Sequence, residues 1–381
     1  RAPLLLALVA SVSAVSAPPR ATVEMSDPPA QRWLPAAKAA LANPLWAGAA
    51  QTVFAAHNAS LFHNVGEERL LALSQATTKH FPAQAEEVRG IANALSLSYE
   101  YLIGWVWFHE LAHTELASPT YMHAAECAAV LVREQGKGGS TWHARNMDQS
   151  PREVRDMALD LTFTLNGEVI MRAVDWYWIG AGVMTAVRAG VASVQENWRV
   201  VEAEPLESAD LLRMAGEGSI TPQLFVFREA LTGGGGGHLV RKNDAPTFGE
   251  LVDYLGNVRL AAPFYIAAAG PNGEGVVLAR GPQSIDESVE LDDSTWSLVQ
   301  TNTDRHAHDP DPDGRRKAGE AAIASLGRAE AATALGVFAV ASTYPTFNPS
   351  TAYTAVMNAK TGDLHAFVRT ALEPPVLPSS T

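Results

Sequence analysis

The chain has 381 residues, of which 47% are hydrophobic and only 18% charged; this excludes a disordered or collagen-like protein and indicates a globular one with a large core. Its formal net charge of −13 opposes the phosphate neutralisation on which nucleic-acid binding depends, so we expect no nucleic-acid partner. The 11 histidines would offset most of that charge if protonated at about pH 5, which suits an acidic lumen.

Residues 1–17 have the pattern of a signal peptide, with an apolar run from Leu4 and small residues at Val15 and Ala17. They predict entry into the secretory pathway, towards a lysosome-like acidic compartment or the extracellular space. Asn58 begins an Asn-Ala-Ser glycosylation sequon, which is consistent with that route. Oxidising compartments favour paired cysteines, yet Cys127 is the single cysteine of the sequence, so no internal disulfide can form.

Between residue 32 and about residue 116, apolar residues recur at spacings of three and four, as in Val88, Ile91, Ala92 and Leu95. This spacing predicts amphipathic helices. After Cys127 the period changes, and the glycine-rich turn near residues 135–140 predicts a hairpin over 127–148. Further strands are expected at 158–165, 168–178, 182–187, 190–200, 262–270, 273–280 and 294–302, with a polar helical segment at 205–260 and a closing hairpin over 351–369. The run Gly233–Gly237 is interpreted as a loop, because it lacks the Lys-Ser/Thr of a phosphate-binding loop.

One short motif raises the possibility of a metal site. His109, Glu110 and His113 form the pattern H-E-x-x-H, in which two histidines on one helix face bind zinc and the glutamate acts as general base. A third protein ligand is needed, for which only Glu115 and His123 are nearby candidates. The competing interpretation is an aromatic-rich helix whose polar residues face a neighbouring unit or solvent.

Cys127 is the other candidate. An isolated cysteine is most often a small buried hydrophobe. Here it begins the β-rich part of the chain, directly after a run at 118–126 that looks like an exposed linker. If the bond between Glu126 and Cys127 were cut, the thiol and a free α-amine would belong to one residue. That amine, with a pKa of about 7.7 to 8, accepts a thiol proton without special burial. Arg145 and Asp148 would hold the amine and the substrate carbonyl in place.

Several long segments, in this order, resemble the acid ceramidase and N-acylethanolamine-hydrolysing acid amidase family: ECAAVLV, HARNMD, APFYIAAAGPNGEGVVLAR, LVQTNTDRHAHDPDPDGRR and STYPTFNPSTAYTAVMNAKTGDLHAFVR. The likeness covers nearly all of 127–370 and, more loosely, the front third. It implies an α+β fold, the αββα sandwich of the N-terminal-nucleophile (Ntn) hydrolases, with a mainly helical N-terminal subunit. It also implies a proenzyme that cleaves itself between Glu126 and Cys127 into a helical region, 18–126, and a catalytic region, 127–381, which form an α/β heterodimer.

The resemblance assigns roles to individual residues. Cys127 matches the nucleophile, Arg145 and Asp148 match the family's Arg-Asn-x-Asp pair, Asn302 matches the oxyanion-hole asparagine, and Arg315 matches a supporting arginine. No cofactor or metal is implied. The implied substrate is a fatty-acid amide lipid, reached through transient membrane or lipid-carrier contact. We expect the apolar stretches 101–108 and 176–179, which include Trp178, to line a groove for the acyl tail.

This sequence also departs from the family pattern. Ala128 and Ala129 follow the cysteine where hydroxyl residues are usual, and Gly314 replaces the second Asp of an Asp-Asp-Arg-Arg run that keeps Asp313. Trp198 stands where a carboxylate is expected; Glu196, two residues earlier, points to the same face of a strand. The linker before Cys127 is longer by about nine residues, and the family's disulfide cysteines are absent.

We therefore expect an amidohydrolase that cleaves ceramide to fatty acid and sphingosine, because QTNTDR and RNMD look closer to the ceramidase branch. An N-acylethanolamine amidase of the same fold is the first alternative. A zinc hydrolase built on His109 and His113, and an inactive lipid-binding relative motivated by Ala128, Ala129 and Trp198, are alternatives of other classes.

Overall fold

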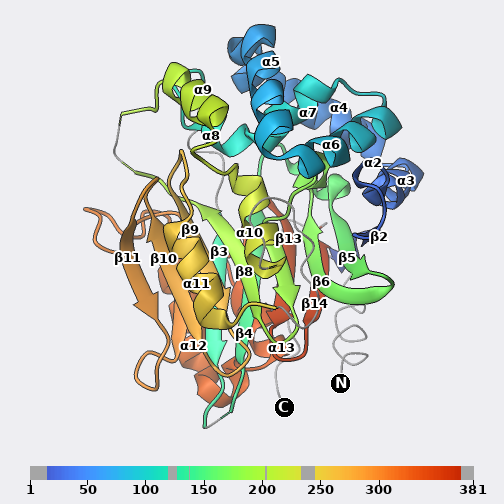
Figure 1. Ribbon diagram of the computed structural model, residues 1–381. Coiled ribbons are helices and arrows are strands. Elements are labelled where there is room, and N and C mark those ends of the chain that lie inside the picture. The colour runs from blue at the N-terminus through green and yellow to red at the C-terminus, as the bar shows by residue number, and fades with distance from the viewer. Residues whose placement is uncertain (1–14, 119–126, 137, 202–203, 233–244, 370–381) are drawn as a thin grey trace.

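The computed structural model describes residues 15–118, 127–136, 138–201, 204–232 and 245–369 (Figure 1). Its first third is helical. The helices there are α2 (Pro29–Arg32), α3 (Leu34–Ala42), α4 (Trp46–His57), the π-helical turn η1 (Asn58–Phe62), α5 (His63–His80), α6 (Pro82–Leu95), α7 (Tyr99–Val106) and α8 (Phe108–Ala112). The helical prediction for this region is confirmed, although the last helix ends at Ala112 rather than near residue 116.

Helix α6 shows why this region is helical. Proline occupies its first position, where a missing N–H costs nothing, and Ser96 ends it in the left-handed conformation. Val88 and Ile91 are fully buried on one face, while Glu86 on the other face is exposed. The apolar stripe seen in the sequence is thus the face that packs on the core.

Two β-sheets make up most of the remainder. The six-stranded sheet has the order β1-β14-β13-β4-β3-β12, and the eight-stranded sheet has the order β11-β10-β9-β8-β7-β6-β5-β2. The strands are β1 (Val15–Ser16), β2 (Arg20–Glu24), β3 (Ala128–Arg133), β4 (Thr141–Asp148), β5 (Leu159–Leu165), β6 (Glu168–Asp175), β7 (Thr185–Arg188), β8 (Ala192–Trp198), β9 (Phe264–Ala269), β10 (Gly275–Arg280), β11 (Ile285–Glu290), β12 (Ser297–Gln300), β13 (Thr351–Asn358) and β14 (Asp363–Arg369).

Three of these strands are not among the sequence expectations. Strand β2 pairs in parallel with β5, a partner more than a hundred residues away, so local pattern does not reveal it. Strand β11 is a mostly exposed edge strand rich in charged residues. Strand β1 pairs with β14 and falls within the expected signal peptide, whose residues 1–14 lie outside the described part of the chain.

The sheets lie face to face and carry helices on their outer sides. Helices α12 (Arg315–Ala331) and α13 (Ala334–Ala341) pack on the six-stranded sheet through a core that includes Val130, Val299 and Phe338. Helix α10 (Gln223–Thr232) contacts β7, β8 and α11 (Phe248–Asn257), while α9 (Ser208–Glu217) contacts α5. The expected α+β fold with helix–sheet–sheet–helix layers is confirmed; the sequence expectations assigned no element to 303–350, which holds α12 and α13.

The helical third covers one end of the sheets (Figure 1). Buried Glu87 of α6 joins it to the later part of the chain, because it accepts from Arg32 Nη1 and Trp33 Nε1, each at 2.8 Å, and from Arg228 of α10. Within the described ranges, we find no helix of a length and apolar character that would cross a bilayer. The run Gly233–Gly237 lies outside these ranges.

Candidate active site

Strand pairing brings the candidate residues to one place. Cys127 directly precedes β3, and β3 pairs antiparallel with β4 so that Ala128 lies opposite Asn146. The end of β4, with Arg145 and Asp148, therefore lies beside the cysteine. Strand β12 flanks β3 on the other side, and Asn302 follows its last residue by two positions.

The Cys127 thiol is buried beside a guanidinium. Its side chain is 2% exposed, and Sγ lies 3.6 Å from Arg145 Nη2 and 3.6 Å from Met147 Sδ. Burial raises the pKa of the thiol to about 11, and the charge of Arg145 only partly offsets this effect. The sulfur is therefore a protonated thiol at physiological pH in this structure.

Arg145 is held rigidly between the two sheets. Its Nη1 donates to the Met184 carbonyl oxygen at 2.6 Å and to Thr185 Oγ1 at 2.5 Å, both in or next to β7 of the facing sheet. Its Nη2 lies 3.6 Å from Glu196 Oε2. Burial raises the pKa of Glu196 to about 7, while the guanidinium opposes that rise. The expectation that Glu196 shares a face with Trp198 agrees with the structure, because both line the cavity beside Cys127.

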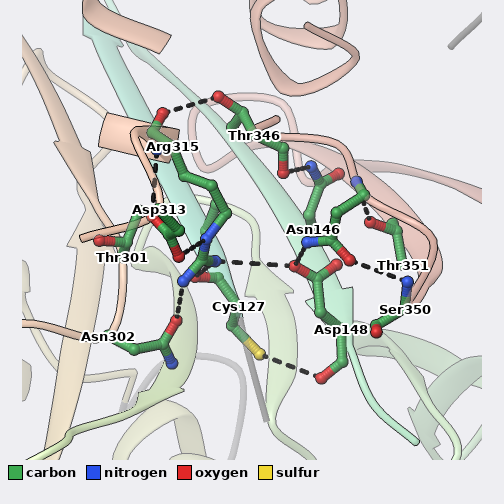
Figure 2. A network of polar contacts seen from close by, with 12 residues as sticks. Cys127, Asn146, Asp148, Thr301, Asn302, Asp313, Arg315, Thr346, Ser350 and Thr351 are labelled. Atoms are coloured by element: carbon green, nitrogen blue, oxygen red, sulfur yellow. Dashed lines mark hydrogen bonds and ion pairs between the residues drawn. The ribbon is translucent and has the colours of Figure 1, made fainter. Parts of the chain in front are cut away.

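Arg315, the first residue of α12, contacts four residues of the site at once (Figure 2). Its Nη1 donates to the carbonyl oxygen of Cys127 at 3.0 Å, and its Nη2 donates to Asn302 Oδ1 at 2.8 Å. Its Nε bonds Asp313 Oδ2 at 2.5 Å, and Nη1 lies 3.8 Å from Asp148 Oδ2. The five residues that the resemblance selects are brought together.

Asn302 and Asp148 are each oriented by a further contact. The side-chain amide of Asn302 donates to the Trp198 carbonyl oxygen at 2.8 Å, and because Oδ1 faces Arg315 the orientation of the amide is defined. Asp148 Oδ2 accepts from Asn348 Nδ2 at 2.7 Å. Asn348 lies in the segment STYPTFNPSTAYTAV and was not selected from the sequence; a buried asparagine before Pro349 is a turn residue by pattern, and only its contact reveals its role.

The backbone conformation at position 314 explains why glycine stands there. Gly314 has φ +71° at the N-terminus of α12, where the chain turns from Asp313 into the helix that begins with Arg315. An L-residue is strained in this conformation. Glycine therefore provides the turn that lets Asp313 and Arg315 pair.

A small cavity lies beside the thiol, between the helical third and the sheet ends. Its volume is about 30 Å³, enough for about two water molecules. Its wall is mainly apolar and includes Trp105, Phe108, Tyr177, Met184, Trp198 and Leu224. Its polar members besides Cys127 include His109, Gln149, Glu196 and Gln223. Residues from both expected apolar stretches thus reach the site.

The structure does not bring Trp178 to this cavity. Its side chain is fully buried, its Nε1 donates to the Met157 carbonyl oxygen at 3.0 Å, and its ring packs near Trp46. The neighbouring Tyr177 takes the place at the cavity wall, because η4 (Tyr177–Gly180) is a short 3-10 helix and not a continuation of β6. The strand expected over 168–178 accordingly ends at Asp175.

A larger cavity, of about 680 Å³, lies on the other side of an aromatic pair. His113 lines this second cavity, and its ring stacks on that of Trp198 with centroids 4.1 Å apart and an angle of 11° between planes. Trp198 in turn lines the cavity beside Cys127. The stacked pair therefore forms part of the wall between the two cavities.

The H-E-x-x-H residues do not form a metal site in the structure. His109 and His113 have ring centroids 4.9 Å apart, but Glu110 Oε1 accepts from the Gln223 backbone N–H at 2.7 Å, at the start of α10. In the described part of the chain, no three or more His, Cys, Asp or Glu side chains are grouped so that they could hold a metal ion. Glu115 bonds Ser208 instead, and His123 lies outside the described residues. The geometry gives the zinc interpretation no support.

Two of the expected modification sites remain untested. Glu126, on the acyl side of the expected cleavage bond, lies outside the described residues, as does most of the preceding linker. Asn58 is exposed on η1, where its side chain faces away from the core. The sequon therefore stays a prediction.

No family model matches the chain, but individual proteins do. The N-acylethanolamine-hydrolyzing acid amidase of Cavia porcellus is 26% identical over 91% of this chain and 89% of its own length, and that of Oryctolagus cuniculus is 27% identical over 74% of this chain and 71% of its own. The acid ceramidase of Homo sapiens is 22% identical over 76% of this chain and 70% of its own. The solved structure of the Caenorhabditis elegans N-acylethanolamine-hydrolyzing acid amidase ortholog matches with a TM-score of 0.52 and 25% identity, over 62% of this chain and 94% of that one.

Both the sequence relatives and the solved structure belong to the group that the sequence motifs indicate. The match to the Cavia porcellus protein covers 91% of the chain and so includes helical third and sheets alike, and the matched structure is an Ntn hydrolase. Over most of its length, the chain is homologous to the acid ceramidase and N-acylethanolamine-hydrolysing acid amidase family.

Proposed function

We propose that this protein is the precursor of an acid amidase that hydrolyses the amide bond between a fatty acyl chain and an amino alcohol, with Cys127 as its nucleophile. The observation that carries the proposal is the position of the thiol, directly before β3 and 3.6 Å from the Arg145 guanidinium. Arg315 donates to the carbonyl oxygen of the same cysteine and also holds Asn302. A buried cysteine with a structural role alone has no need of these polar neighbours.

The uncut chain has the properties of a latent form. The cavity beside the thiol has room for about two water molecules, and burial raises the pKa of the Cys127 thiol to about 11. Cleavage between Glu126 and Cys127 would free an α-amine next to the sulfur and separate the helical region, 18–126, from the catalytic region, 127–381. Since the chain has a single cysteine, the two pieces of the heterodimer would remain together only through packing and contacts such as that between Glu87 and Arg228.

The reaction then runs in two steps. The Cys127 sulfur attacks the acyl carbon while its proton passes to the α-amine of the same residue. A second N–H of Asn302 stabilises the oxyanion, and the α-ammonium returns the proton to the departing amine as the carbon–nitrogen bond breaks. Water then attacks the thioester, gives a proton to the α-amine, and releases the fatty acid and the thiol. Arg145 stabilises the thiolate, Arg315 holds the backbone carbonyl of Cys127, and the Asp148 carboxylate lies beside the Arg315 guanidinium.

Two kinds of lipid amide are candidate substrates within this class. Ceramide is the first candidate because of the segments QTNTDR and RNMD. An N-acylethanolamine is the second, and it is favoured by the N-acylethanolamine-hydrolysing relatives, one of which matches 91% of this chain compared with 76% for the human ceramidase. The proposed location is an acidic compartment of the secretory pathway or the extracellular space, with transient contact to a membrane or lipid carrier for substrate delivery.

Acid incubation of the purified precursor, followed by N-terminal sequencing and a hydrolysis assay, tests the proposal. We expect a fragment that starts at Cys127, and release of fatty acid from ceramide, from an N-acylethanolamine, or from both. Cys127→Ala should give neither fragment nor product. Full amidase activity in that variant, or a working enzyme that retains the bond before Cys127, would overturn the mechanism. Lipid binding by an uncut chain without hydrolysis would instead identify an inactive relative.

A further inference from the structure

The wall of the cavity beside Cys127 contains a histidine that the mechanism does not use. His109, in the short helix α8, is 5% exposed, and within the described residues neither Nδ1 nor Nε2 has a hydrogen-bond partner. A buried polar atom without a partner destabilises the folded state, so such groups are rare unless they serve a function. Two nitrogens on one ring that no described residue pairs point to a ligand as their partner.

The ring is held in place by its apolar faces rather than by hydrogen bonds. Its centroid lies 4.7 Å from that of Trp198, 4.9 Å from that of His113 and 5.6 Å from that of Phe264. These contacts fix the orientation of the imidazole, and the residue lines the cavity beside Cys127. The position of the ring is therefore set before any ligand arrives.

The chemical character of the His109 ring limits which ligand groups can pair with it. Burial and the neighbouring His113 hold the pKa of His109 well below its usual range, which favours the neutral imidazole. A neutral imidazole offers one donor and one acceptor. Among common lipid groups, a hydroxyl matches this best, because it also both donates and accepts. Glu196 and Gln223, on the same cavity wall, add further polar atoms.

We propose that His109 is a specificity-determining residue that hydrogen-bonds the hydroxyl of the substrate's amino-alcohol half. This inference rests on the proposed amidase function and narrows it: the preferred substrates carry a hydroxyl on the carbon chain next to the amide nitrogen, as ceramide and N-acylethanolamines both do. Deoxy analogues, which lack this hydroxyl, are poor substrates because they leave the buried imidazole unpaired.

The test compares paired substrates that differ only in this hydroxyl. One pair is an N-acylethanolamine and the N-acyl-ethylamine with the same acyl chain; the other is ceramide and its 1-deoxy form. For the processed wild-type enzyme, we expect kcat/KM to be about tenfold or more higher for the hydroxylated member. In His109→Leu this ratio falls to about one, because the hydroxylated substrate loses its partner and the deoxy substrate does not. His109→Gln, which keeps a donor and an acceptor, restores part of the ratio.

A neighbouring histidine provides the matched control. His113 is similarly buried and stacks on the same Trp198, but it lines the other cavity. His113→Gln should change kcat/KM for both members of a pair by the same factor. An unchanged ratio in both His109→Leu and His109→Gln, measured per cleaved enzyme, would overturn the inference while leaving the amidase function intact. Absence of any amide hydrolysis by the processed wild type would overturn the proposed function itself, and the inference with it.

Discussion

Arg315 donates a hydrogen bond from Nη1 to the carbonyl oxygen of Cys127, across 188 positions of sequence, at 3.0 Å. The same guanidinium holds Asn302 Oδ1 at 2.8 Å through Nη2. The planar guanidinium therefore holds both the backbone of the proposed nucleophile and the proposed oxyanion donor. The single ammonium nitrogen of a lysine could not make both contacts in this geometry.

Arg315→Lys should consequently lower kcat at least about tenfold and slow the formation of the fragment that starts at Cys127. The neighbouring Arg316 is also buried, but its Nη2 donates to the Thr303 carbonyl oxygen and not to the site. Arg316→Lys is thus the control for loss of a buried guanidinium. Equal kinetic effects of the two changes would contradict the proposed role of Arg315.

Asn302→Ala should lower kcat by a factor of about 10² to 10³, because the developing oxyanion loses a fixed donor. Since its Oδ1 also accepts from Arg315, the thermal unfolding of the variant must be recorded beside its kinetics. A variant that folds normally and retains wild-type kcat would exclude Asn302 as the oxyanion donor.

The thiol of the uncut precursor should be unreactive. At a thiol pKa of about 11 and an exposure of 2%, alkylation by iodoacetamide at about pH 8 should be on the order of 10² times slower than for the unfolded chain. Mass spectrometry reads the result without ambiguity, because Cys127 is the single cysteine. Rapid labelling of the folded precursor would show that the thiol is already activated before cleavage.

Glu110→Gln should change the pH dependence of stability and leave catalysis nearly intact. Burial raises the pKa of Glu110 from 4.5 to about 7, so the folded state binds the proton more tightly than the unfolded state. The wild type therefore loses stability as pH rises from about 4.5 to about 7, by about 2 to 3 kcal/mol from this group. The glutamine keeps the acceptor for the Gln223 N–H and cannot ionise.

Denaturant unfolding at several pH values checks this: relative to the wild type, the variant should gain stability towards neutral pH. Glu67→Gln, at an exposed position of α5, is the control for loss of a surface carboxylate. Loss of more than about 10²-fold in kcat in Glu110→Gln would instead favour a general-base role for this residue, as in a zinc hydrolase.

Glu87→Gln should weaken the association of the two cleaved pieces. Its carboxylate accepts from Arg32 and from Arg228, so the change leaves two buried guanidiniums without their counter-charge, at a cost of about 3–5 kcal/mol. Denaturant unfolding and size-exclusion chromatography after acid incubation measure this effect. Glu86→Gln, one position earlier but exposed, should leave both unchanged. Intact association in the Glu87 variant would mean that apolar packing alone holds the pieces.

Local pattern was sufficient for much of the fold. The periods of three to four before Ala112 and of two after Cys127 give the helices and most strands, because each period reports which face of an element is apolar. The lone cysteine at the start of the β-rich part, followed by the Arg-Asn-Met-Asp segment, is also visible in the chain itself. These features depend on neighbours a few residues apart.

The local sequence pattern did not show which other element each helix or strand face packs against. Trp178 and Tyr177 are adjacent and both aromatic, yet one packs in the core and the other lines the cavity. From the sequence, His109 is a candidate zinc ligand and Asn348 is a turn residue. Only their contacts with residues distant in the sequence show their surroundings. Strand β2 and Arg315 likewise owe their roles to partners more than a hundred residues away. The sequence alone determined most of the helices and strands before residue 303, and it singled out Cys127 at the change from helical to β-rich pattern. Tertiary structure decided which side chains share the site, because long-range packing, and not periodicity, selects the partner of each buried polar group.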